Sequence, residues 1–388
     1  MKRPGLRLPA PADPADTPVA SRFGWCILCG AQIEDSLGNM DSITQSLLGA
    51  VVAQAGFRRT LGRRAVVAGA LLGAVPDLDV VAGMFGPYAN WLYHRGITHS
   101  IFFGPVMGPL FGWALWRFSR WRARKRGGTG VLAGPEELRS WIWLAILVLF
   151  THPIIDVFTS YGTQLLAPFS RHRFAIDALP IIDPIYSLVL VAALVVGTFA
   201  RRRPGAAVVS AAAALLFIYS WTLMGWAINE NIRAEARQQL KTAGQPVQNI
   251  LAYPQLFQPW FRRVVAETPD SIMVGYYSIM AGGTIEWTSH PIQHDPLIDR
   301  VAMTREAGIF QWFAMDKLWW RVVENADGAA VEAFDYRYGM MGSTELGFWG
   351  IRAQVDRDGQ LLGPPESFQQ PRSASRSDFR EYWRRIWG

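Results

Sequence analysis

Long apolar runs separated by short polar segments fill residues 42–226. They predict helices at 42–57, 64–75, 97–116, 141–158, 184–200 and 205–226. The last four have the length of about 17–22 residues that crosses the hydrocarbon core of a bilayer. The first two are shorter and rich in Gly and Ala, and Gly49, Gly69 and Gly73 would let helices approach closely. We therefore expect an α-helical membrane bundle of five to six spans over residues 40–226.

Beyond residue 226 the hydropathy pattern becomes that of soluble sequence. Alternating apolar and polar residues predict strands at 271–280, 318–324 and 329–338, and the spacing at 305–317 predicts a short helix. A small soluble α+β domain is thus expected at 227–376. The last residues, 377–388, predict a basic aromatic helix, which either lies on a membrane surface or packs on its own domain.

The first 39 residues resemble neither part. They lack the apolar segment that follows the basic start of a signal peptide. The composition of the sequence changes at Met40, where the segment MDSITQSLLGA begins. We expect residues 1–39 to be a disordered leader or to precede the true start. The only two cysteines, Cys26 and Cys29, form a lone C-x-x-C there. We expect this pair to be incidental, because a structural zinc site needs four ligands.

The net charge of +7 comes largely from loops between the apolar runs. Basic residues concentrate at 58–64, 117–128 and 201–204, which is the pattern of a membrane protein. The expected partner is therefore the lipid bilayer, and we expect no nucleic acid because no binding motif accompanies the charge. Under the positive-inside rule these loops are cytoplasmic, which places the intervening polar segments and the C-terminal domain outside the cytoplasm.

Four clusters of polar residues lie at span ends on that outer side. They are Asp77 and Asp79, then His94, Arg95 and His99, then His152 and Asp156, and finally Arg171, His172, Arg173, Asp177 and Asp183. Taken alone, each cluster fits a helix-ending turn, a buried hydrogen-bonded pair or a headgroup anchor. Together they hold four of the six histidines in the chain. Such groups are costly near a bilayer, so the conjunction favours a metal or acid/base site.

The residue types and spacings indicate a divalent metal. His152 and Asp156 are four residues apart and share one helix face. His94 and His99 converge only if His94 precedes the helix, and Gly96 allows such a break. Mixed imidazole and carboxylate ligands suit Zn²⁺, Mn²⁺ or Fe better than Mg²⁺, with Zn or Mn expected first. The predicted ligands, for one or two ions, are Asp77, Asp79, His94, His99, His152 and Asp156.

Five segments in order carry a resemblance to a known family. They read MDSITQSLLGA, GALLGAVPDLD, WLYHRGITHS, THPIIDVFTSYGTQLLAPFS and RFAIDALPIIDPIY, and they span residues 40–200. Together they resemble the YdjM-like family of membrane-bound metal-dependent hydrolases, which carries the description LexA-binding, inner-membrane hydrolase. The resemblance implies a bacterial inner-membrane protein with metal-dependent hydrolase activity and no defined substrate. Many members have Thr-His where this chain has Thr44-Gln45, so no role is carried to Gln45.

The sequence thus leads to a hydrolase of the inner membrane. Its expected substrate is amphipathic and lipid-like, with phosphorylated lipids included, and is met at the outer face. Arg95 and Arg173 are expected to bind a phosphate or carboxylate through their planar forks. Asp183 or Asp177, as carboxylates that need not bind metal, are the candidates for a general base.

Three alternatives stay open. His152 followed by Asp156 resembles part of a metal-free lipid phosphatase with a phosphohistidine intermediate, although the accompanying Lys/Arg-Pro and Ser-Gly-His motifs are missing. A transporter or ion-binding protein would need polar residues continuing toward the cytoplasmic side. A signalling or assembly protein would use its soluble domain to bind partners.

Overall fold

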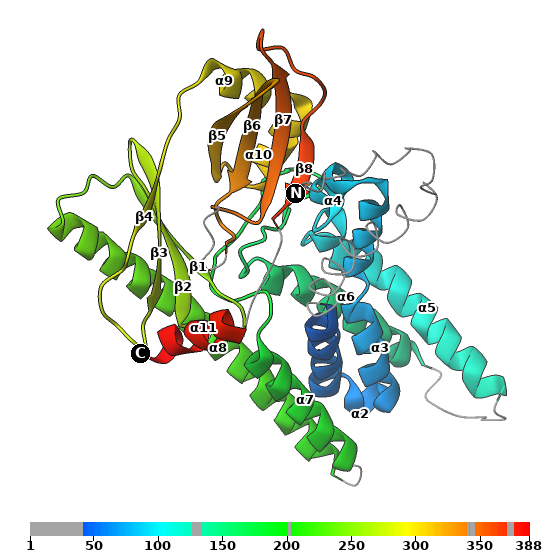
Figure 1. The fold of residues 1–388 in the computed structure, drawn as a ribbon. Coiled ribbons are helices and arrows are strands. Elements are labelled where there is room, and N and C mark those ends of the chain that lie inside the picture. The colour runs from blue at the N-terminus through cyan, green and yellow to red at the C-terminus, as the bar shows by residue number, and fades with distance from the viewer. Residues whose placement is uncertain (1–41, 126–133, 201–202, 340, 342–345, 371–375) are drawn as a thin grey trace, which may run out of the picture. The chain divides into compact units, whose positions relative to one another are not determined.

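The computed structural model describes residues 42–125, 134–200, 203–339, 341, 346–370 and 376–388, so the expectations for residues 1–39, Cys26 and Cys29 lie outside it. Its first part is helical (Figure 1). The elements are a helix at 42–56, α2 (Arg58–Leu61), α3 (Arg63–Gly73), the 3-10 helix η1 (Pro76–Phe85), α4 (Pro87–Tyr93), the 3-10 turn η2 (Ile97–His99), α5 (Phe103–Lys125), α6 (Pro135–Asp156), α7 (Pro184–Phe199) and α8 (Pro204–Thr242).

Proline sets where several of these helices begin. It is the first residue of α4, α6, α7 and α8, where its fixed φ suits the first turn and its missing N–H costs nothing. The helices predicted at 42–57, 64–75 and 184–200 are confirmed within two residues. The helix predicted at 205–226 continues to Thr242, because its polar second half packs on the C-terminal region.

The helix predicted at 97–116 is wrong at both ends. It begins at Phe103 and runs to Lys125. Residues 97–102 instead form a turn, in which the Ile101 amide donates to the Leu165 carbonyl at 3.0 Å. Along α5, Gly104, Gly108 and Gly112 lie against α6 and leave no room for side chains.

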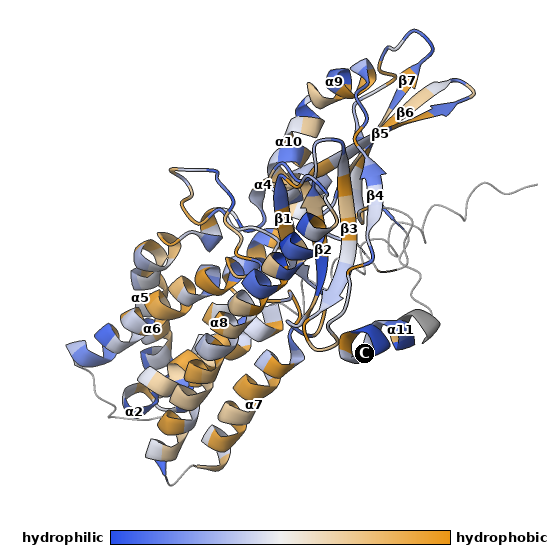
Figure 2. Cartoon of the chain, turned by 90° about the vertical axis from the view of Figure 1, so that its left-hand side faces the viewer, coloured by the Kyte–Doolittle hydropathy of each residue, from blue (hydrophilic) through white to orange (hydrophobic). Residues whose placement is uncertain are grey.

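Three segments of the described chain are long and apolar enough to cross a membrane by length and composition. They are Arg63–Phe85, Pro135–Asp156 and Gly205–Thr242, and α7 is a shorter apolar helix. Figure 2 shows hydrophobic residues along α7 and the lower part of α8. Helix α5 is outside this set, and its last turn carries Arg122, Arg124 and Lys125. The structure therefore supports a helical membrane part, while the predicted count of five to six spans is not confirmed by the described residues.

Basic residues gather at one end of the helical part. Arg58 donates to the Gly197 carbonyl, and Arg63 to the Thr198 carbonyl. Arg64 contacts Ser119 and forms an ion pair with Glu137 at 3.3 Å. Helices α3 and α6 both start at this end, so their far ends, where the predicted Asp and His ligands lie, point away from it.

Glycines allow the helix at 42–56 to lie directly on α3. A Cβ added to Gly49 would overlap the Gly69 carbonyl, and one added to Gly69 would overlap the Gly49 carbonyl. A Cβ on Gly73 would likewise overlap the Gln45 carbonyl. The predicted close approach at these glycines is thus confirmed, and it fixes Gln45 beside the end of α3.

We expect Gly69→Ala to destabilise the protein by about 1–3 kcal/mol, because the methyl group forces the two helices apart. Gly56→Ala is the matched control, since a Cβ at Gly56 meets open space and alanine favours a helix. Thermal unfolding in detergent would show a lower Tm for Gly69→Ala alone. Equal Tm values for the two variants would contradict this packing.

Two antiparallel sheets make up the C-terminal region. The first contains β1 (Asn249–Pro254), β2 (Phe261–Glu267), β3 (Ser271–Ser278) and β4 (Thr288–Pro291), and the second β5 (Leu318–Asn325), β6 (Gly328–Asp335), β7 (Trp349–Asp356) and β8 (Glu366–Gln369). Helices α9 (Pro296–Ala302), α10 (Arg305–Phe313) and α11 (Arg376–Trp387) complete it. Apolar residues from both sheets share one core. The predicted α+β character of this region is confirmed.

The C-terminal helix packs on its own domain. The buried Ile386 carbonyl accepts from Ser278, and the Tyr382 hydroxyl donates to the Leu256 carbonyl at 2.6 Å. Phe379 and Trp387 remain exposed on the other face of α11.

Candidate metal centre

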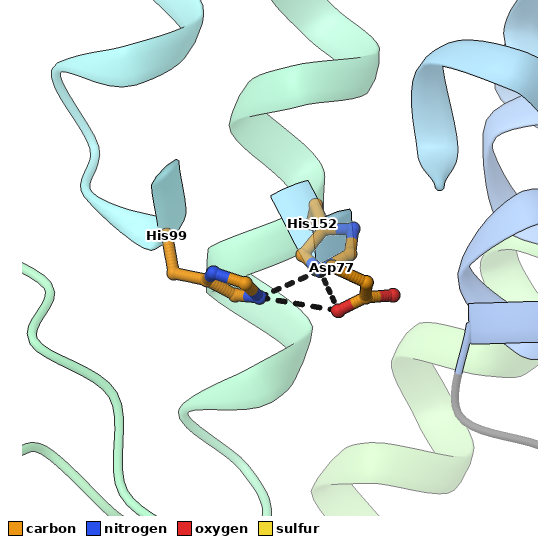
Figure 3. Close-up of side chains that lie close together, drawn as sticks. All are labelled: Asp77, His99 and His152. Atoms are coloured by element: carbon orange, nitrogen blue, oxygen red, sulfur yellow. Dashed lines mark hydrogen bonds and ion pairs between the residues drawn. The ribbon is translucent and has the colours of Figure 1, made fainter. Parts of the chain in front are cut away.

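Three predicted ligands converge at the far end of the helical part. Asp77 comes from η1, His99 from η2 and His152 from the last turns of α6, and Figure 3 shows the side chains directed toward one another. One donor atom from each lies within 4.8 Å of the others. Asp77 Oδ1 is 3.3 Å from Nε2 of His99 and 3.3 Å from Nε2 of His152, and the two Nε2 atoms are 3.1 Å apart.

Local sequence places these donors. Helix α3 ends at Gly73, and Pro76 then starts the tighter η1, so Asp77 lies just beyond the end of α3. His152 precedes Pro153 within α6 and is almost fully buried. His99 ends η2 and is fully buried. Three elements that are remote in sequence thus deliver one donor each to one buried point.

Outer hydrogen bonds leave both Nε2 atoms available. Nδ1 of His152 lies 2.8 Å from the Gly73 carbonyl, which can only accept, so this nitrogen carries the proton. Nδ1 of His99 lies 3.0 Å from Oδ2 of Asp79 and is assigned a proton in the same way. Such carboxylate and carbonyl partners fix the ring orientation of metal-binding histidines. The Nε2 lone pairs then face each other and Asp77, an arrangement that a cation between them would stabilise.

Asp156 lies beside the three donors. Its Oδ2 is 3.3 Å from Nε2 of His99 and 3.6 Å from Nε2 of His152. The Nε of Arg95 is 3.6 Å from the same oxygen. On the other side, the Gln45 amide donates to Oδ1 of Asp156 at 2.8 Å. The protein therefore holds Asp156 in place with its Oδ2 directed at the histidines.

The spacing suits an ion of the size of Zn²⁺. Ligands at the about 2.0–2.2 Å of Zn–N and Zn–O bonds stand about 3.3–3.6 Å apart at the corners of a tetrahedron. Nε2 of His99, Nε2 of His152 and Oδ1 of Asp77 are 3.1, 3.3 and 3.3 Å apart. These three atoms are therefore spaced like one face of a tetrahedron around a single ion.

Charge and hydrogen bonding support the same fit. Asp77, Asp79 and Asp156 bring three carboxylates together, and the guanidinium of Arg95 lies beside Asp156, which leaves an excess of two negative charges if the imidazoles are neutral. Oδ2 of Asp77 and Oδ2 of Asp156 are buried and accept no hydrogen bond from the described residues. Buried carboxylates need a partner, and a divalent cation would balance both the charge and the bare oxygens.

Asp79 and His94 lie one contact further out. Besides His99, Asp79 accepts from the Thr98 hydroxyl at 2.6 Å and from the Arg95 amide at 3.1 Å. His94 ends α4, and its Nδ1 is 2.7 Å from Oδ1 of Asp79. Gly96 does allow the chain to turn between the two histidines, whose rings are 5.9 Å apart. The turn brings His94 to Asp79, and Asp79 in turn orients His99.

The predicted anion-binding arginines have other partners. Arg95 is buried, its Nη1 donates to the Thr159 hydroxyl at 2.8 Å, and its guanidinium lies 5.0 Å from the Tyr161 ring centre. Arg173 is also buried and donates to the carbonyls of Tyr161 and Gly162. These contacts give both guanidiniums a place in the protein interior.

The predicted bases Asp177 and Asp183 lie away from the three donors. Asp183 caps α7 through the Tyr186 amide and accepts from Trp221 at 2.7 Å. Asp177 adopts a positive φ of 56°, and burial raises the pKa of its carboxyl although Ser160 and Arg337 oppose this. Over the described ranges, no contact joins Arg173, Asp177 or Asp183 to Asp77, His99 or His152.

The structure adds two residues that the sequence left without a role. Gln45 donates to Asp156, and the Gly73 carbonyl orients His152. Gln45 stands where many members of the resembled family have histidine. This difference drew attention to the position, but it did not indicate that the side chain contacts Asp156. The Gly73 carbonyl carries no signal at all, because any residue has a carbonyl group.

Helices able to cross a membrane and a buried cluster of imidazoles and carboxylates define a helical membrane protein with a candidate metal centre. Residues 40–228, just under half of the chain, match the YdjM inner membrane protein family. The resemblance drawn from the five sequence segments is thus confirmed, and together with the apolar helices the match supports a membrane location.

Two bacterial relatives match more distantly. The uncharacterized protein YfhP of Bacillus subtilis (strain 168) is 24% identical over 216 residues, which cover 54% of this chain and 58% of the relative. The inner membrane protein YbcI of Escherichia coli (strain K12) is 35% identical over 114 residues, 29% of this chain and 57% of the relative. The chain thus spans less than two thirds of each relative's length. No solved structure matches it.

Proposed function

We propose that this protein is a metal-dependent hydrolase of the inner membrane that acts on an amphipathic, lipid-like substrate at the outer face. The observation that carries the proposal is the convergence of Asp77, His99 and His152 on one buried point with an excess of negative charge. The match of residues 40–228 to the YdjM inner membrane protein family supports the membrane location.

Asp77, His99 and His152 would hold the ion, with Zn or Mn as the expected metal. Two histidines and one carboxylate are the protein ligands of several hydrolytic zinc sites, which keep a further position for water or substrate. When bound, such a cation polarises the scissile group and lowers the pKa of water to about 7. Asp79 and the Gly73 carbonyl hold the two imidazoles in the tautomer that ligation needs.

Asp156 is the best-placed general base. Its Oδ2 accepts no hydrogen bond from the described protein, yet it lies 3.3 Å from a donor atom of the site. Gln45 and Arg95 fix the carboxylate from two sides without using that oxygen for a hydrogen bond. A proton leaving a water at the open position could therefore pass to Oδ2 of Asp156. This gives Asp156 the role that the sequence suggested for Asp177 or Asp183.

The surroundings of the site suit a lipid-like substrate. Helix η1 carries Asp77 and Asp79 on its inner face, while Met84 and Phe85 on it are 82% and 84% exposed. Leu78, Val80 and Val81 of η1 are also exposed. An apolar surface of this kind beside a polar site favours contact with lipid chains. We infer that the substrate keeps its apolar part in the bilayer while its polar group reaches the metal centre.

The proposed side of the membrane follows from the arginines. Arg58, Arg63 and Arg64 meet at the end opposite to the metal centre. If this basic end faces the cytoplasm, the metal centre and the C-terminal region face outward.

Purified full-length protein in lipid nanodiscs tests the function. We expect about one divalent ion per chain by elemental analysis, and metal-dependent hydrolysis of a short-chain phosphatidic acid or a related ester lipid. Removal of the metal with a chelator should abolish turnover, and added Zn²⁺ or Mn²⁺ should restore it. Full activity in the metal-free protein, or a protein that binds no divalent ion, would overturn the proposal.

A further inference from the structure

The segment that joins α6 to α7, residues 157–183, is here called the site loop. It contains neither an α-helix nor a strand of a sheet, so other parts of the chain must satisfy its backbone. Within it, the Thr163 amide and carbonyl pair with Phe174, and the Gln164 amide donates to the Arg95 carbonyl at 3.0 Å. The site loop therefore lies directly against the segment that carries Arg95 and His99.

Arginines from the C-terminal region bind carbonyls of the site loop. Arg337, which follows β6, is 1% exposed and donates to the Ser160 carbonyl at 3.0 Å and to the Tyr161 carbonyl at 3.4 Å. Arg262 of β2 is fully buried and donates to the carbonyls of Asp177 and Ala178. The loop is thus held near both of its ends by guanidinium groups from the two sheets.

Arg337 is itself fixed. Its Nη2 is 2.6 Å from Oδ2 of Asp335, its Nε is 2.9 Å from Oδ1, and its Nη2 also donates to the Phe313 carbonyl at 3.1 Å. A two-pronged pair with a carboxylate leaves a guanidinium little freedom. Lysine could keep the charge beside Asp335, but it could not reach the carboxylate and the loop carbonyls together.

A short series of contacts leads from Arg337 to the metal centre. The ring of Tyr161, whose carbonyl Arg337 binds, contacts the guanidiniums of both Arg95 and Arg173, with its centre 5.0 and 5.2 Å from them. Thr159 accepts from Arg95. Arg95 then pairs with Oδ2 of Asp156 at 3.6 Å. Movement of the site loop would therefore move the cation that holds Asp156.

We propose that Arg337 is a positioning residue for the metal centre, and that the C-terminal α+β region completes the site by fixing the site loop under Arg95. This rests on the proposed function in so far as Asp156 is the base. It assigns a role to residues outside the part that matches the family, 40–228. In this protein the membrane part and the C-terminal region would form one catalytic unit.

The test compares Arg337→Lys with Arg263→Lys in the full-length protein. Arg263 is a matched control, because it is 2% exposed and donates to the carbonyls of Tyr336 and Leu346 and to the Tyr276 hydroxyl. We expect amide hydrogen exchange across residues 158–165 to become about 10-fold faster in Arg337→Lys only, since local opening sets that rate. Turnover should fall about 10-fold with an altered pH profile, while Arg263→Lys changes only the Tm.

Two further variants keep the test decisive. If Arg337→Lys does not fold, Tyr161→Leu removes the ring under Arg95 while it leaves the Arg337–Asp335 pair intact, and it should give the same altered pH profile. Exchange in the Arg337→Lys, Arg95→Lys double variant should be no faster than in Arg337→Lys alone, because both act through one series of contacts. Equal exchange in Arg337→Lys and Arg263→Lys, or faster exchange with unchanged turnover, would overturn the positioning role. A wild type without turnover would instead refute the proposed function, and the double variant would still decide the coupling.

Discussion

Purified His99→Ala protein is expected to contain no stoichiometric divalent ion and to show no hydrolysis above background. His99 contributes a nitrogen that lies 3.1 Å from Nε2 of His152 and 3.3 Å from Oδ1 of Asp77. Loss of an outer hydrogen-bond partner costs about 10–100-fold in metal affinity, and loss of a ligand should exceed this. Elemental analysis after dialysis and titration with Zn²⁺ against a chelator would measure the change.

Two matched variants show whether the effect belongs to the ligand. His172→Ala removes an exposed histidine from the site loop and should leave the metal content unchanged. Asp79→Asn should fall between the two, with an about 10–100-fold loss of affinity, because Asp79 orients His99 without being one of the three donors. Full metal content in His99→Ala, together with a native Tm, would show that the convergence of these side chains is not a metal site.

Much of the helical part follows from local pattern. Apolar runs with proline at or next to their start define helices α7 and α8, and the glycine stripes mark where helices meet. The run that predicts a helix at 141–158 misses the polar first turns of α6, which begins at Pro135. The pattern fails at residues 97–102, for which it predicts the first turns of the helix formed by the apolar run that follows. There a hydrogen bond from Ile101 to Leu165 competes with the helix and turns the chain, so that His99 points inward. A contact between such distant residues leaves no mark on local periodicity.

The candidate site shows the same division. Asp77, His99 and His152 could be predicted because their residue types are chemically distinctive and lie at span ends. The division of the six predicted ligands into three donors, the neighbouring Asp156 and the outer pair Asp79 and His94 could not be predicted, since it depends on three-dimensional contacts between side chains. Gln45 lies 111 residues from Asp156, and Arg337 lies 177 residues from Ser160. Glutamine and arginine are common polar residues and are not typical metal ligands, so the sequence alone suggests no role for Gln45 and Arg337 at the site.

Asp156→Asn is expected to keep the metal and lose the reaction. The amide can still accept from Gln45 and remains nearly the same size, but it can neither take a proton nor pair with the charge of Arg95. Because positioned acid–base groups contribute about 10²–10⁴-fold, turnover should fall by that factor while metal affinity changes only a few-fold. Single-turnover kinetics and metal titration on the same preparation would separate the two quantities.

The opposite result would reassign Asp156. Its Oδ2 lies 3.3 and 3.6 Å from the two Nε2 atoms, close enough to the imidazoles to bind the same ion as they do. If Asp156→Asn loses its metal as completely as His99→Ala, all four side chains bind the ion, and the closed tetrahedron has the character of a structural zinc site. Asp183→Asn is the control for the general effect of removing a buried carboxylate, because Asp183 caps α7 away from the donors. This variant should lower the Tm. It should alter neither the metal content nor the rate per folded molecule. Retained metal with a lost reaction in Asp156→Asn alone would therefore mark Asp156 as the base, held in place by Gln45 and Arg95.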